Sequence, residues 1–130
     1  MSIDKINDLS LHNSAIAEGL HKAASRVIDS GWYAMGPEVT AFEKAFAAYC
    51  GTADAIGVAN GTDAIELALR AVGVAQGDEV ITVANAGFYS STAIRAIGAV
   101  PVYVDILENT LLMDPASAAT AITVKTKAIV

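Results

Sequence analysis

The sequence predicts an α/β protein, a mostly parallel sheet with helices on both faces in three layers. Apolar runs of strand length alternate with segments in which apolar residues recur at helical spacing. Gly, Pro and Asn separate these segments, as is typical of turns. The composition agrees, because 54% of the residues are hydrophobic and only 6% aromatic, which suits Ala, Ile, Leu and Val buried in a parallel sheet. We expect right-handed crossovers behind a helical N-terminal layer.

Two helices are expected in that N-terminal layer. Residues 1–13 are polar with scattered apolar side chains and are expected to form an arm, and Ser14 is expected to cap a helix ending near residue 28. A second helix is expected over residues 37–50, with an apolar stripe buried in the core and Cys50 as a small buried residue. The stripe consists of Val39, Phe42, Phe46 and Tyr49.

The stretch after this layer predicts a short strand at residues 56–58, a tight turn at Asn60-Gly61 and then a helix. Thr62 or Asp63 can cap the helix, and Asp63 with Glu66 has the spacing of a capping box. A helix that follows a Gly, with a hydroxyl beside its free N–H groups, suits a phosphate. The patterns of a P-loop and of a dinucleotide-binding turn are both absent.

Three further strands are expected, at residues 79–84, 101–105 and 127–130, with helices over 92–97 and from 115 between them. In open parallel sheets, ligands lie outside the carboxyl ends of the strands. The residues that follow strand ends are therefore the candidate site. They are Asn60, Gly61 and Thr62, the segment from Asn85 to Ser91, and Asp105.

Charge and composition exclude several classes of function. A net charge of −6 argues against nucleic acid or an anionic membrane as a partner. No apolar run reaches the roughly 18 residues of a spanning helix, and the first residues lack the apolar core of a signal peptide. The single cysteine, Cys50, cannot form an internal disulfide, which suits a reducing cytoplasm. His12 and His21 have no partners at metal-ligand spacing, so no metal site is expected.

Several spaced motifs carry a resemblance to a known family. They lie at residues 36–51, 58–65, 77–81, 98–105 and 122–129. Over residues 20–130 the chain resembles the DegT/DnrJ/EryC1/StrS-type sugar aminotransferases, pyridoxal-phosphate enzymes of fold type I in the aspartate-aminotransferase superfamily. The resemblance implies the N-terminal part of the large domain of such an enzyme, over residues 14–130, truncated after about four strands.

The resemblance also implies roles for individual residues. Backbone amides at Gly61, Thr62 and Asp63 would hold the cofactor phosphate, and the Thr62 hydroxyl would add a bond. An aromatic side chain after the next strand would stack on the pyridine ring, with Tyr89 favoured and Phe88 as the alternative.

For the substrate, the resemblance places Trp32 and Tyr33 near a sugar nucleotide. The segment 85–89 is most similar to members that make 3-amino sugars on a dTDP carrier. The implied reaction moves an amino group, with glutamate as the expected donor, to a keto sugar nucleotide. The implied assembly is a homodimer, which would cover apolar surface.

The resemblance places the Schiff-base lysine, and the acidic partner of the pyridine nitrogen, beyond Val130. We therefore expect an N-terminal fragment of marginal stability that is inactive by itself. Three alternatives stay open: a sugar dehydratase of the same family with histidine in place of the lysine, a non-catalytic member, and an unrelated doubly wound domain that binds another phosphate ligand. The lysines present match solvent-facing positions, and they are Lys5, Lys22, Lys44, Lys125 and Lys127.

Overall fold

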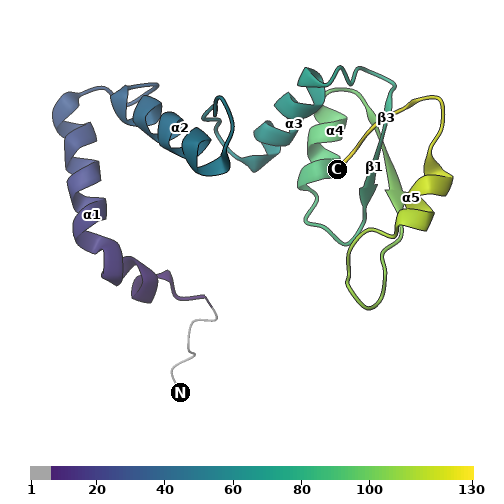
Figure 1. Cartoon of the computed structure of the whole chain (residues 1–130), viewed down its shortest axis with the longest axis horizontal. Helices are drawn as coiled ribbons and strands as arrows, with labels where there is room; N and C mark the ends of the chain where they lie inside the picture. Colours follow the sequence, from purple (N-terminus) through teal and green to yellow (C-terminus); the bar gives the residue numbers. More distant parts are fainter. Residues whose placement is uncertain (1–6) are drawn as a thin grey trace. The chain divides into compact units, whose positions relative to one another are not determined.

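The computed structural model describes residues 7–130 (Figure 1). The contacts divide the chain into two units, one up to Gly57 and one over Val58–Val130, which are described separately. The first unit contains the helices α1 (Leu9–Ser30) and α2 (Pro37–Cys50). The second contains α3 (Gly61–Ala71), β1 (Glu79–Val83), α4 (Tyr89–Ala96), β2 (Val100–Val104), α5 (Pro115–Ala121) and β3 (Thr126–Ile129).

The sheet of the second unit has the order β2-β1-β3, with both pairings parallel. β1 is therefore the central strand. Its register with β2 places Thr82 opposite Tyr103 and Val83 opposite Val104. The pairing of β1 with β3 shifts by a bulge between Glu79 and Val80. Parallel pairing brings the carboxyl ends of the strands to one edge of the sheet.

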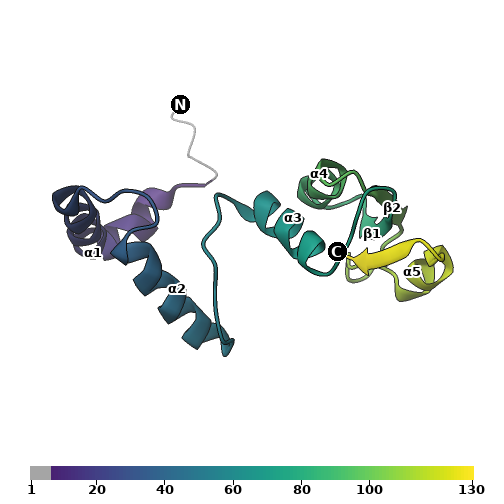
Figure 2. The same ribbon diagram turned by 90° about the horizontal axis from the view of Figure 1, so that it is seen from above.

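The core lies on both faces of this sheet. One cluster packs α3 and α4 against β1, with Leu69, Val80 and Ile94 among its buried residues. A second cluster packs α5 on the opposite face through Ala118, against Ile81 and Val104. Figure 2 shows α4 and α5 on opposite sides of the strands. The predicted α/β class, with a parallel sheet covered by helices on both faces, is confirmed.

The strand predicted at residues 56–58 is wrong, so the sheet has three strands where about four were expected. A strand needs a hydrogen-bonded neighbour, and no described segment pairs with these residues. Ile56 is 81% exposed, so strand-like apolar residues alone did not define a strand. The other strands form within one residue of their predicted bounds.

The sequence predicted the presence of these helices more accurately than the residues at which they begin. α1 begins at Leu9, capped by an Asp8 carboxylate oxygen that accepts from the Ser10 N–H at 2.9 Å. Ser14 is inside this helix and donates to the Leu11 carbonyl, so the predicted cap is wrong. Of the predicted arm, residues 1–6 lie outside the described residues. α4 also starts early, at Tyr89, because its buried Ala93 and Ile94 fix a helix that extends back through one more turn.

The predicted burial of the α2 stripe is wrong as well. Phe42 is 60% exposed and Tyr49 87% exposed, and Cys50 is an exposed free thiol. Phe42 and Phe46 stack on each other along the helix, with ring centroids 5.5 Å apart. Helical periodicity marks an apolar face, but a face becomes core only where another element covers it. Within the described residues of this unit, no element does so. No described helix is both long and apolar enough to cross a membrane.

The buried position of Ile94 predicts a measurable cost of shortening its side chain. We expect Ile94→Val to lower the free energy of unfolding by about 0.5–1.5 kcal/mol, because a methylene is lost from a fully buried site. The control Leu112→Ala, at a 68% exposed position, is expected to cost less than about 0.5 kcal/mol. Urea unfolding followed by circular dichroism measures both. Equal losses would contradict the assignment of Ile94 to the core.

A charged pair joins the two helices of the first unit. The Arg26 guanidinium of α1 donates to both Glu38 carboxylate oxygens in the first turn of α2, at 2.8 and 3.1 Å. These hydrogen bonds and the charge attraction lower the pKa of Glu38 and raise that of Arg26. Because the pKa of Glu38 is lowered on folding, its contribution to stability is present above its ordinary pKa. That contribution is lost as the pH falls through the lowered value.

Replacing Arg26 tests this pair. We expect Arg26→Gln to raise the pKa of Glu38 back toward its ordinary value, since the charged donor is removed. An NMR pH titration of the Glu38 carboxyl measures the shift. The control Lys22→Gln removes a cation that pairs with Glu18 on the same helix and should leave Glu38 unchanged. A Glu38 titration unaffected by Arg26→Gln would show that the pair does not form in solution.

Candidate functional site

The turn before α3 is fixed by Asn60. Asn60 has extended backbone (φ −164°, ψ 174°), and its side-chain oxygen accepts from the Asp63 N–H at 3.0 Å. Its amide nitrogen in turn donates to the Asp63 carboxylate at 3.1 Å. The pair resembles a capping box three residues earlier than expected, except that the Asp63 carboxylate accepts from the Asn60 side chain and not from its backbone N–H. The predicted caps, Thr62 or Asp63, are therefore wrong, because Gly61 is already helical.

Glu66 also has a different partner from the one expected. Instead of completing a capping box with Asp63, its carboxylate accepts from Arg70 one turn later, at 2.9 Å. This i, i+4 pair lies on the exposed side of α3. Glu66 therefore stabilises the helix and leaves the turn to Asn60.

Capping by Asn60 leaves specific donors at the start of α3. The amides of Gly61 and Thr62 open the helix and have no intrahelical acceptor, whereas the Asp63 amide is used by the cap. Among the described residues, no hydrogen bond to the Thr62 hydroxyl is formed. A Cβ placed on Gly61 would meet nothing within 4 Å, so the space in front of these donors is open. The positive end of the helix dipole points there.

An open pocket of about 720 Å³ lies over these donors. Its lining consists of Asn60, Gly61, Thr62, Asp63, Ile65 and Tyr89. Four of the predicted cofactor residues are thus brought together: Gly61, Thr62, Asp63 and Tyr89. Phe88, the predicted alternative to Tyr89, does not line the pocket, and its side chain is 78% exposed.

Trp32 and Tyr33 belong to the first unit, in the loop between α1 and α2. The Trp32 indole N–H donates to the Ala34 carbonyl at 2.9 Å. The indole also packs over Gly36, where an added Cβ would lie 3.1 Å from the ring. Tyr33 is 70% exposed. These contacts order the loop, and the role of both residues in a substrate site stays a prediction.

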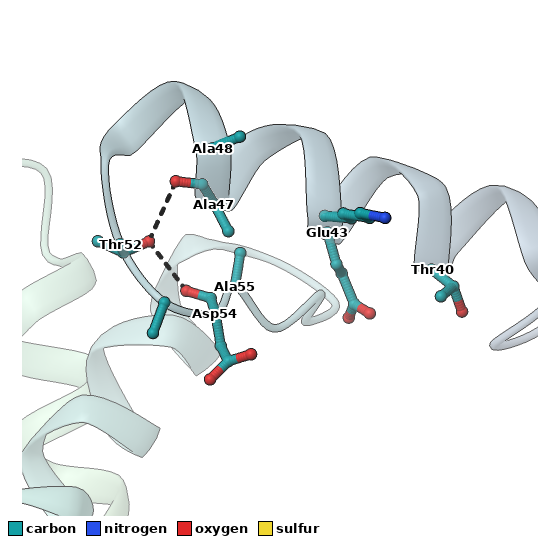
Figure 3. A pocket seen from close by; sticks show the side chains of 9 residues that line it. Thr40, Glu43, Ala47, Ala48, Thr52, Asp54 and Ala55 are labelled. Atoms are coloured by element: carbon teal, nitrogen blue, oxygen red, sulfur yellow. Dashed lines mark hydrogen bonds between the residues drawn. The ribbon is translucent and has the colours of Figure 1, made fainter.

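A second pocket, of about 360 Å³, lies beside the end of α2 in the first unit (Figure 3). In its lining, the Thr52 hydroxyl forms hydrogen bonds with the carbonyl oxygens of Ala47 and Asp54. The Glu43 carboxylate at its side accepts from the Gly57 N–H at 2.7 Å. These groups satisfy one another and fix the chain after α2, so the pocket serves local structure.

The residues at the start of α3 fit a phosphate attached to a planar ring. Two free amides and a hydroxyl at a helix N-terminus are donors for a phosphate, and the Tyr89 ring offers a flat apolar surface. The nearby Asp63 charge is engaged by the Asn60 amide. Sequence reasoning missed Asn60 as the cap, although its spacing of three to Asp63 was the available signal. Across residues 7–130, His, Cys, Asp and Glu form no metal-binding group.

Comparison with known proteins identifies similar sequences. A sequence profile of the DegT/DnrJ/EryC1/StrS aminotransferase family matches residues 14–130. The dTDP-3-amino-3,6-dideoxy-alpha-D-galactopyranose transaminase of Aneurinibacillus thermoaerophilus is 46% identical over 122 residues, covering 94% of this chain and 34% of that protein.

Solved structures are also similar to this chain. A structure of S. venezuelae DesV in complex with a ketimine intermediate gives a TM-score of 0.89 at 43% identity, over 94% of this chain and 33% of that one. NtdA of Bacillus subtilis with bound cofactor PMP gives 0.87 at 35% identity, over 99% of this chain and 30% of that one. The chain spans about a third of the length of these relatives.

Removing the cap is expected to destabilise α3. We predict that Asn60→Ala lowers the free energy of unfolding by about 0.5–2 kcal/mol, because the Asp63 N–H loses its acceptor. Asn60→Ser keeps a capping oxygen and should retain most of that stability. Urea unfolding, with hydrogen exchange of the first turn of α3, separates the two variants. If Asn60→Ala proved as stable as Asn60→Ser, the side chain would not be the cap.

Proposed function

Because this chain belongs to the DegT/DnrJ/EryC1/StrS aminotransferase family, we propose that its protein is a pyridoxal-phosphate-dependent sugar aminotransferase. It transfers an amino group, from glutamate as donor, to a dTDP-linked keto-deoxyhexose and forms a 3-amino sugar. The observation that carries this proposal is the placement of the free Gly61 and Thr62 amides in one pocket with the Tyr89 ring. The name of the A. thermoaerophilus relative supports the choice of substrate and of amino transfer over dehydration.

Within this proposal, the chain binds and orients the cofactor. The Gly61 and Thr62 amides donate to the phosphate, and the Thr62 hydroxyl adds a third donor. The helix dipole favours the negative phosphate at this end of α3. When bound, pyridoxal phosphate supplies the electron sink through which amino groups move between substrates. The Tyr89 ring would offer a flat apolar surface to one face of the pyridine ring.

The carboxylate of Asp63 is the negative charge in the lining of this pocket. A free carboxylate beside the phosphate would repel it. The Asn60 amide donates to this carboxylate and holds it to the cap. Asn60 therefore serves both the helix and the anion, because it accepts from one backbone amide and restrains the nearest negative charge.

The lysine that carries the cofactor comes, in this proposal, from outside residues 1–130. Support comes from the pocket, whose lining among the described residues contains no lysine. The relatives matched are about three times as long as this chain, which agrees with such an arrangement. Trp32 and Tyr33 are proposed to contact the sugar nucleotide, supported by the exposure of both rings.

We also propose a homodimer in the cytoplasm. The exposed aromatic side chains of α2, Phe42 and Phe46, support an assembly in which a second surface covers them. The single cysteine, Cys50, is a free thiol, which agrees with a reducing compartment.

A chimeric enzyme tests the function. Residues 14–130 replace the matching third of the A. thermoaerophilus relative, and glutamate-dependent amination of a dTDP-linked keto sugar is measured. We expect activity in the chimera. Thr62→Val is expected to weaken cofactor affinity roughly ten- to a hundredfold, because a donor to a charged phosphate is lost. The control Thr40→Val, on the exposed surface of α2, should bind the cofactor as the parent does.

The outcomes separate the parts of the proposal. A folded chimera that binds pyridoxal phosphate but never aminates the sugar would contradict the aminotransferase function. Consumption of the sugar without glutamate would favour the dehydratase. Unchanged cofactor affinity in Thr62→Val would remove Thr62 from the phosphate site.

A further inference from the structure

The Tyr89 ring lies at a helix start that has no side-chain cap. Tyr89 is the first residue of α4, and Phe88 before it makes no capping hydrogen bond. The buried residues of the helix, Ala93 and Ile94, lie one turn further on. Helix ends without caps fray, so a ring at this position needs another restraint to hold a single orientation.

The restraint comes from the neighbouring strand. The Tyr103 hydroxyl of β2 donates to the Ser91 hydroxyl, in the first turn of α4, at 2.9 Å. The backbone of Tyr103 is held by its pairing with Thr82 of the central strand, which is 1% exposed. Thr82 and Val80 share one face of the sheet, the face that α4 covers. The first turn of α4 is thereby tied to the sheet through one side chain.

A second restraint lies at position 87. A Cβ placed on Gly87 would lie 2.8 Å from Cε2 of Tyr89 and 3.3 Å from Cδ2. The ring edge thus occupies the space that any side chain at position 87 would take. Gly87 is required here for close approach, and its backbone forms a stop against which the Tyr89 ring rests.

We propose that Tyr103 is a positioning residue for the Tyr89 ring, acting through Ser91, with Gly87 leaving the space that the ring edge occupies. The inference rests on the proposed function, because the ring so positioned is the one that covers the cofactor. Tyr103 itself is not among the residues lining the pocket. It acts on the cofactor only through the start of α4.

The test has two readouts, the first on the 130-residue chain and the second on the chimeric enzyme. The first needs no cofactor: the NMR nuclear Overhauser effect between the Gly87 Hα protons and the Tyr89 ring protons. It is expected in the parent and should be lost in both Tyr103→Phe and Ser91→Ala. Tyr49→Phe, at an exposed tyrosine of α2, is the matched control and should keep it. Gly87→Ala should displace the ring while the Tyr103–Ser91 hydrogen bond remains.

The second readout uses the chimeric enzyme described above and compares two ligands, pyridoxal phosphate and inorganic phosphate, by phosphorus NMR titration. Tyr103→Phe should weaken the affinity for pyridoxal phosphate roughly three- to tenfold, because one hydrogen bond is lost. The affinity for inorganic phosphate should stay unchanged. Ser91→Ala should have the same effect, and the double variant no more than either single one, since both remove one interaction.

Each outcome of these measurements supports or contradicts the inference. A Gly87–Tyr89 effect that persists in Tyr103→Phe would overturn the inference, and so would its loss with unchanged pyridoxal phosphate affinity. A chimeric enzyme that folds but binds neither ligand would overturn the proposed function, and the inference with it. Weakening of both ligands by Tyr103→Phe would mean that Tyr103 acts on the whole pocket, which also contradicts a role specific to the ring.

Discussion

The pairing of β1 on both edges is the constraint on which the second unit depends. β1 has a parallel neighbour on each side and a helical layer on each face, so its central residues, Val80, Ile81 and Thr82, are almost completely buried. Both apolar clusters include residues of this strand. The segment that leaves its carboxyl end starts from a fixed point and leads within six residues to Tyr89. The position of the Tyr89 ring therefore depends on the position of β1 in the sheet.

At the start of α3, the Asn60 side chain makes two opposing requirements of a helix N-terminus compatible. A helix needs its first amides satisfied, whereas an anion site needs some of them free. Asn60 meets the first demand by taking the Asp63 amide, and the Gly61 and Thr62 amides remain for a ligand. The absence of a side chain at Gly61 keeps the approach open.

The fold class and the position of the candidate site were predictable from the sequence. Strand-length apolar runs between helical segments determine a parallel sheet, and topology places Tyr89 after β1, whereas the turn before α3 follows no strand. The residues that escaped prediction share one property, which is dependence on a partner elsewhere. The segment at Ile56 lacked a strand to pair with, and the α2 stripe lacked an element to cover it. Periodicity describes one element and carries no information about its neighbour.

The same limit applies within the site. Gly61 and Thr62 were identified because an exposed helix start is a local feature. The choice between Phe88 and Tyr89 depended on where α4 begins, and the structure places that start at Tyr89, which lines the pocket whereas Phe88 does not. The residue that caps α3 is the one of Asn60, Thr62 and Asp63 that has extended backbone, and this is Asn60. Spacing alone does not determine which of the three it is.

The hydroxyl of Thr62 has a consequence for how such a site can vary. Since the cap is made two residues earlier, the side chain at position 62 carries none of the stability of the helix start. Anion affinity and helix stability are therefore set at separate positions, 62 and 60. Substitutions at 62 can adjust how strongly an anion is held without unfolding the turn that holds it. Position 60 is restricted to side chains that can cap the helix, so it varies less freely than position 62.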